Sequence, residues 1–228
     1  MSELLLAIDA ATSHGGVAIG RGGVAIAEVS LGDTRRHSEL LLPAVEFVLQ
    51  AAAAKRSDVS AIVVGAGPGS FTGVRIAAAT ARGLAAALDI PLLAYSSLAA
   101  LAAGAGGGAA PVCAMFDAKR GEVYAACYRF TEDTIDTLLA PMAAPIADVM
   151  FEIELVRALT QANVKYVGEG ALLYARETGV DTCSAPVTPR AGALLWLAHH
   201  DRAAGTVADT TAFEPTYVRA SAAERKSL

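Results

Sequence analysis

The stretch that decides the fold is AIVVGAGPGSFTGVRIAAATARGLAAAL, which runs from Ala61 to Leu88. It opens with a short apolar run and closes with an alanine-rich segment typical of a helix. Glycines gathered at a turn indicate backbone conformations closed to other residues, or a very close approach of another group. The stretch therefore predicts a strand, a tight turn and a helix. The turn holds Gly65, Gly67, Gly69 and Gly73.

Glycine turns at helix starts often bind phosphate, so the known motifs have to be compared with this one. A P-loop places Lys directly after its last glycine, whereas Val74 follows Gly73 here. The third glycine of a dinucleotide fingerprint would fall on Ser70 or Thr72, and a nucleophile elbow around Ser70 would need glycine in place of Pro68. A packing turn or a partner-docking turn remains.

The helix that follows the turn is apolar nearly all round, and such helices are buried on more than one side. It is a core helix, or it is shared with another subunit, because small residues let a second helix approach closely. The sequence leaves both interpretations open. In the second, the partner interface would comprise Gly73, Arg75, Ala78, Ala81, Arg82 and Ala85.

Composition limits the classes of protein to consider. The 228 residues are 54% apolar and carry a formal net charge of −5, which argues against a chain that grips nucleic acid by itself. Three cysteines without C-x-x-C spacing fit a reducing compartment. Only five apolar residues, Leu4 to Ile8, precede the first acid after Glu3, so we expect no signal peptide. We expect a cytoplasmic protein without a membrane partner.

The N-terminus predicts a strand at Leu4 to Ile8 and an antiparallel meander after it. Asp9 ends the first strand, and Thr12 and Ser13 follow in the turn. This arrangement resembles the first phosphate loop of the actin, sugar-kinase and Hsp70 superfamily. Asp117 repeats the pattern of strand, Asp and tight turn, through duplication or coincidence, and it could share a cleft with Asp9.

The glycine-rich run at 104–110 is the most linker-like part of the chain. We therefore expect an N-terminal lobe over residues 1–106 and a smaller C-terminal lobe over residues 107–228. Whether the last helix packs back on the first lobe stays open. In the second lobe we expect a strand pair, a polar turn, a helix around Ala147 to Gln161, a strand at Tyr166-Val167, and helices at Ala171 to Glu177 and Ala191 to Ala203.

Metal chemistry has little support in the sequence. The adjacent His199 and His200 point about 100° apart on a helix and cannot chelate one metal together. No H-x-x-x-H or H-E-x-x-H pattern occurs. His37, near a helix start, is expected in solvent.

Four segments carry a specific resemblance to a known family, and together they span most of the chain. They are GPGSFTGVRIAAATARGLA (Gly67 to Ala85), HSELLLPAVEFVL (His37 to Leu49), DAKRGEVYAACY (Asp117 to Tyr128) and PTYVR (Pro215 to Arg219). In this order they resemble the TsaB family, also called YeaZ. The resemblance implies an α/β, two-lobed, actin-like (ribonuclease H-like) ATPase fold of the ASKHA superfamily, with a shortened and degenerate second lobe.

The resemblance also implies a function. TsaB proteins are partner subunits in bacterial threonylcarbamoyladenosine synthesis on tRNA, where the catalytic paralogue TsaD transfers the threonylcarbamoyl group to the adenosine beside the anticodon and TsaE is an ATPase. It implies a non-catalytic assembly subunit that binds a TsaD-like paralogue and a TsaE-like ATPase, forms a homodimer when alone, and meets tRNA only through the complex. Cofactors of its own are not expected; ATP and metal are expected on the partners.

Two other functions stay open. The chain could be an active ATPase or small-molecule kinase that uses Asp9, Thr12, Ser13 and Asp117 around a magnesium nucleotide. A hydrolase that uses Ser70 is the third, although no base is positioned for it.

Overall fold

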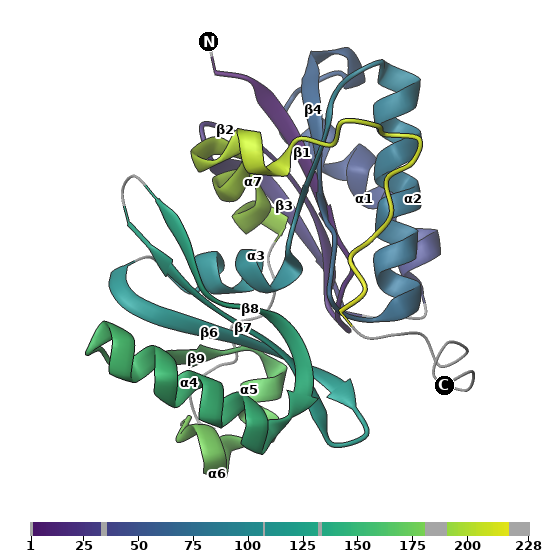
Figure 1. Ribbon diagram of the computed structural model, residues 1–228. Helices are drawn as coiled ribbons and strands as arrows, with labels where there is room; N and C mark the ends of the chain where they lie inside the picture. Colours follow the sequence, from purple (N-terminus) through teal and green to yellow (C-terminus); the bar gives the residue numbers. More distant parts are fainter. Residues whose placement is uncertain (1, 33–35, 107, 132–133, 181–190, 219–228) are drawn as a thin grey trace.

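A computed structural model describes residues 2–32, 36–106, 108–131, 134–180 and 191–218 of the chain. Two mixed α/β lobes lie one above the other (Figure 1). Each lobe is built on one sheet, with strand order β3-β2-β1-β4-β5 in the first and β8-β7-β6-β9 in the second. No helix within these ranges is long and apolar enough to cross a bilayer.

The first lobe begins with an antiparallel meander to which two parallel strands are added. β1 pairs antiparallel with β2 and parallel with β4, so β1 lies at the centre of the sheet. Helices α1 and α2 pack on one face of this sheet through a shared apolar core. The elements are β1 (Leu4–Asp9), β2 (Gly15–Arg21), β3 (Val24–Leu31), α1 (His37–Ala51), the 3-10 turn η2 (Arg56–Asp58), β4 (Val59–Gly65), α2 (Phe71–Leu88), β5 (Leu92–Tyr95) and α3 (Ser97–Gly104).

The second lobe repeats the first four positions of that topology. Its first strand, β6, again pairs antiparallel with the next strand and parallel with the strand after the first helix. This shared strand order favours duplication over coincidence for the repeated Asp motif. The elements are β6 (Gly108–Lys119), β7 (Glu122–Phe130), β8 (Ile135–Pro145), α4 (Ile146–Thr160), β9 (Lys165–Val167), α5 (Glu169–Leu173) and α6 (Ala175–Thr178). Helices α7 (Ala191–His200) and α8 (Arg202–Gly205) follow them in the chain.

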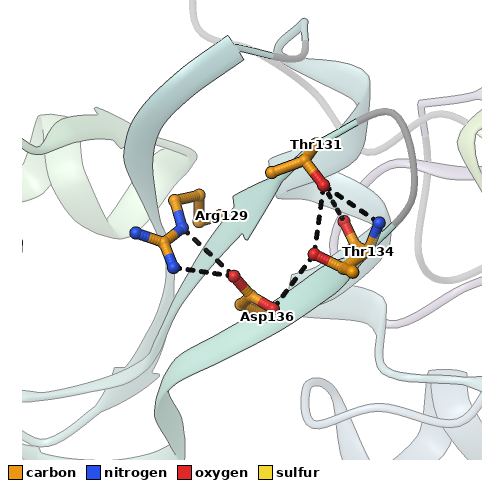
Figure 2. Close-up of polar contacts among 4 residues, drawn as sticks. All are labelled: Arg129, Thr131, Thr134 and Asp136. Carbon is orange, nitrogen blue, oxygen red and sulfur yellow. Dashed lines mark hydrogen bonds and ion pairs between the residues drawn. The ribbon is translucent and has the colours of Figure 1, made fainter.

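Strand β8 is the element that the sequence pattern missed. The sequence predicts only a polar turn between the preceding strand and α4, and the segment holds Pro141, Pro145 and several alanines, which are poor strand formers. The structure makes it the edge strand of the second sheet, where a missing amide donor is tolerated. Polar contacts fix its hairpin to β7: Arg129 donates to Asp136 Oδ2 from Nε and Nη2, at 3.1 and 2.8 Å, and Thr134 contacts Thr131 and Asp136 (Figure 2).

Helix α7 packs on the first sheet although it follows the second lobe in sequence. Its Leu194, Leu195 and Leu197 share one buried cluster with residues of β1, β4 and α3. The same cluster contains residues of β6 and β7, because α3 lies between the two sheets (Figure 1). Trp196 of α7 meets Phe130 of β7 edge to face, with ring centroids 5.6 Å apart. One continuous core therefore joins the two lobes.

Candidate functional site

The glycine turn between β4 and α2 packs against the turn that follows β1. A β-carbon on Gly65 would overlap the Asp9 carboxylate, one on Gly69 would overlap the carbonyl of Ala11, and one on Gly73 would overlap the carbonyl of Ala10. These three glycines are therefore required by close backbone approach. The sequence left a packing turn and a partner-docking turn open, and this geometry is that of a packing turn.

The amides of the glycine turn largely donate within the chain. Ala66 donates to the Tyr95 carbonyl at 2.8 Å, Gly67 to the Ser97 hydroxyl at 3.2 Å, and Ser70 to the Ala11 carbonyl at 2.6 Å. Ser70 caps α2, since its hydroxyl accepts the Gly73 amide. A phosphate-binding loop needs amides that point at the ligand, and these four are already engaged.

Asp9 lies behind the turn rather than in an open site. Its side chain is buried, with Oδ1 accepting the Ala11 amide at 2.8 Å, and Oδ2 accepts no hydrogen bond from the described residues. Burial raises the pKa of the Asp9 carboxyl, and the nearby Ala11 amide, Ser97 hydroxyl and Ala10 amide oppose that rise only in part. The carboxylate therefore faces Gly65 and the inside of the lobe.

A cleft of about 490 Å³ brings three of the four predicted phosphate-loop residues together. Thr12 and Ser13 from the first lobe line it opposite Asp117 from the second. Asp9 is not among its lining residues. The remaining walls are formed by Ala11, Gly69, Ser70, Phe71, Phe116, Ala118, Lys119, Tyr124 and Glu169.

Most of the polar groups in this cleft already have partners. Thr12 donates to the carbonyl of His14 at 2.9 Å and accepts the His14 amide at 3.1 Å. The Asp117 carboxylate accepts the Lys119 amide at 2.7 Å and pairs with the Lys119 ammonium. Partial burial acts to raise the pKa of Asp117, but these contacts with Lys119 outweigh it and hold the pKa below its usual value.

Helix α2 has a different outer face from the one expected. Gly73, Ala78, Ala81 and Ala85 lie on its buried side, and Ala81 and Ala85 belong to the core under the first sheet. A partner that approaches from solvent would not contact these side chains. Arg75 is exposed and Arg82 half-buried, as rim residues should be. The exposed side of α2 instead carries a stripe of small residues that the sequence analysis did not identify: Thr72, Ala79, Gly83 and Ala86.

The C-terminal residues 207–218 run along α2 as an extended strap (Figure 1). The Thr216 amide donates to the carbonyl of Ala66 at 2.8 Å, which ties the strap to the glycine turn. Arg82 donates to the carbonyls of Thr211 and Phe213, at 2.5 and 3.4 Å. The last residue of the PTYVR segment, Arg219, lies outside the described residues.

A small aromatic cluster fastens the end of the strap. Tyr217 accepts a hydrogen bond from Arg75 Nε at 2.9 Å, and its ring centroid lies 5.7 Å from that of Phe71. The Arg75 guanidinium stacks 3.8 Å from the Phe71 ring centroid. One rim residue of the expected interface therefore holds the strap in place.

Other residues noted in the sequence are structural. His37 is buried, and the expectation that it lies in solvent is wrong, because it packs against the backbone at Gly15. His200 stacks on Trp196 instead of facing an open site. Cys113 and Cys127 are free thiols buried in the core of the second lobe, whereas Cys183 lies outside the described residues. The described residues contain no group of three or more His, Cys, Asp or Glu placed to hold a metal ion.

Comparison with known proteins agrees with this architecture. Residues 26–226 match the family model described as "TsaD: tRNA N6-adenosine threonylcarbamoyltransferase". The chain is 32% identical to the tRNA threonylcarbamoyladenosine biosynthesis protein TsaB of Bacillus subtilis, over 97% of this chain and 96% of that one. It is 41% identical to Escherichia coli TsaB over 58% of this chain and 57% of the relative.

A solved structure shares the fold over nearly the whole length. It is a Pseudomonas aeruginosa protein described as uncharacterized with similarity to peptidase YEAZ, with a TM-score of 0.80 and 33% identity over 95% of this chain and all of that one. Two lobes of related topology around a cleft define the chain as a two-lobed, actin-like protein of the ASKHA class. Within that class, the chain belongs to the TsaB (YeaZ) family.

Proposed function

We propose that this chain takes part in tRNA threonylcarbamoyladenosine biosynthesis as a non-catalytic assembly subunit. Its relatives from Bacillus subtilis and Escherichia coli carry that pathway in their names. In this proposal the chain supports a TsaD-like paralogue, which performs the transfer, and a TsaE-like ATPase. It meets tRNA only through the complex, in the cytoplasm.

The observation that carries the proposal is the outer face of α2. Thr72, Ala79, Gly83 and Ala86 form a small, uncharged stripe, and a β-carbon on Gly83 would meet no atom within 4 Å. Small residues let a second helix approach closely, and Arg75 and Arg82 supply polar groups at the rim. The paralogue would pair with this stripe, and a second copy of the chain would use the same stripe in its absence.

The cleft between the lobes is assigned no catalytic step. A kinase would use Thr12, Ser13 and Asp117 with an acid that reaches magnesium, but the Asp9 carboxylate is enclosed by Gly65 and Ala11. We propose that the chain holds no cofactor of its own and that ATP and metal bind the partner subunits. Titration calorimetry with ATP and magnesium should give weak or no binding, and a micromolar Kd would favour the kinase alternative.

Substitutions on α2 test the assembly. Ala79→Arg and Gly83→Leu enlarge the outer stripe without entering the core, so both should fold and lose at least about tenfold in affinity for the paralogue from the same organism. Ala203→Arg, at an exposed position of α8, is the matched control. Light scattering and circular dichroism provide the readouts, together with the threonylcarbamoyladenosine content of tRNA in a complemented strain. Unchanged assembly by both folded α2 variants would remove α2 as the interface.

A further inference from the structure

The outer face of α4 carries an apolar ridge that no described part of the chain covers. Phe151, Leu155 and Leu159 are spaced four residues apart and are 65%, 46% and 84% exposed. Residues at this spacing are neighbours along one side of a helix. Single exposed apolar residues are ordinary, but a contiguous ridge of three usually marks an interaction surface.

The helix does not need this ridge for folding. Its opposite side supplies Val149, Ile153 and Val156 to the core under the second sheet. The ridge therefore faces away from that core. A helix that is apolar on its outer side as well as on its inner side has a second surface to bury.

Acidic side chains border the ridge on both edges. Asp148 and Glu152 lie along one edge and Glu154 along the other, at the angles that 3.6 residues per turn give. Arg157 is the basic residue of this helix, and it is engaged by Glu154 at 2.6 Å and by the Tyr166 hydroxyl at 3.1 Å. The Glu154 edge is thus compensated by Arg157, whereas Asp148 and Glu152 on the other edge form no ion pair with another described residue.

From this pattern we propose that the α4 face (Phe151, Leu155 and Leu159 with Asp148, Glu152 and Glu154) docks an amphipathic helical segment of a partner protein. The segment would be apolar along one side, with Lys or Arg at its edges. Such a segment places its anchors on the ridge and its cations opposite the acids, which gives charge complementarity as well as burial.

The charges also decide against other occupants. Two α4 faces brought together would oppose acids to acids, which disfavours a second copy of the chain. Nucleic acid and anionic lipid surfaces carry phosphates, which the same acids repel. Helix α4 covers the side of the second sheet opposite α3, away from the first lobe (Figure 1), so this face is separate from the outer stripe of α2.

Synthetic peptides test the proposal on the full chain. One is an amphipathic helix of leucine, alanine and lysine, and its match has glutamate in place of every lysine. In fluorescence anisotropy the lysine peptide should bind the wild-type protein, and the glutamate peptide should not. Binding should weaken at least about tenfold in Phe151→Gln/Leu155→Gln/Leu159→Gln, which keeps the net charge. Asp148→Lys/Glu152→Lys should weaken binding of the lysine peptide and allow the glutamate peptide to bind.

Controls separate this face from general attraction to an acidic protein. Val24→Gln/Ile26→Gln replaces two exposed apolar residues of β3 in the other lobe and should bind like the wild type. Gly83→Leu should also bind normally, so failure of the α2 proposal would not affect this result. Circular dichroism checks that every variant folds.

Three results would overturn the proposal. Equal binding of the lysine peptide to the triple variant and to the wild type would mean that the peptide is attracted only by the overall negative charge of the protein. No binding to the wild type at low ionic strength would mean that the face is covered or inert. A drop in oligomer mass in the triple variant, seen by light scattering, would identify a second copy as the occupant.

Discussion

The Asp9 carboxylate lies directly against the α-carbon of Gly65, so that the end of β1 and the end of β4 touch through an acid and a glycine. The two residues are the last of β1 and β4, which are parallel neighbours in the first sheet. Through this contact the acid that resembles a phosphate-loop residue becomes part of the packing of the glycine turn. Each partner constrains what the other position can hold.

Gly65→Ala should therefore be strongly destabilising, because the added methyl group overlaps the Asp9 carboxylate. We expect a loss of ~2–4 kcal/mol in the free energy of unfolding, measured by urea denaturation. Asp9→Gly in the same chain should recover part of this loss, since it removes the clashing group. A double-mutant cycle with purely additive effects would show that the contact does not limit position 65.

Asp9→Asn should change the pH dependence of stability. The folded protein holds the Asp9 pKa above its ordinary value of 3.8, so over that window the folded state binds more protons than the unfolded state. Stability of the wild type therefore falls as pH rises from 3.8 through the raised pKa. The Asn variant lacks this term, so its stability relative to the wild type should increase with pH in urea titrations. A difference that is constant or decreases with pH would contradict the assignment.

Ala81→Glu and Gly83→Leu should have opposite effects on folding although they lie two residues apart on α2. Ala81 is fully buried, so a carboxylate there should cost more than ~3 kcal/mol. Gly83 faces open space, and leucine should stabilise the exposed helix by up to about 1 kcal/mol through its higher propensity. Thermal unfolding followed by circular dichroism compares the two. A stable Ala81→Glu protein would return that residue to the outer face.

Tyr217→Ala should release the end of the strap while the lobes stay folded. The change removes the hydrogen bond from Arg75 and the ring contact with Phe71. Hydrogen exchange should then accelerate at the Thr216 amide, which donates to Ala66. Tyr217→Phe keeps the ring, so it should lose only about 0.5–1 kcal/mol and retain most of the protection. Equal protection of Thr216 in Tyr217→Ala and wild type would mean that the cluster does not fasten the strap.

Much of the fold could be predicted from local patterns. The apolar run before Gly65, the glycine turn and the helix after it have short-range causes, and the structure has them where the sequence predicts them. The missed strand β8 depends on a neighbour distant from its own pattern: alanines and prolines become a strand there because β7 offers a partner.

The candidate sites were harder to predict because they depend on the direction in which individual side chains point. The composition of α2 indicates a helix with two small faces, but it does not indicate which alanines point at the sheet; Ala81 and Ala79 look equivalent in sequence. Only packing on β4 separates them. Similarly, the resemblance named Asp9 as a phosphate-loop residue, whereas its burial against Gly65 depends on parallel pairing of β1 with β4.

The core shared by the two sheets has a consequence for the autonomy of the lobes. Helix α7 begins only at Ala191, and it supplies Leu194, Leu195 and Leu197 to the face of the first sheet that α1 and α2 do not cover. A fragment that ends at residue 106 would leave this face open to water and would lack the partner of α3. Neither half of the chain is then a module that can be cut out, exchanged or made in isolation. The polypeptide has to be nearly complete before its first sheet can close.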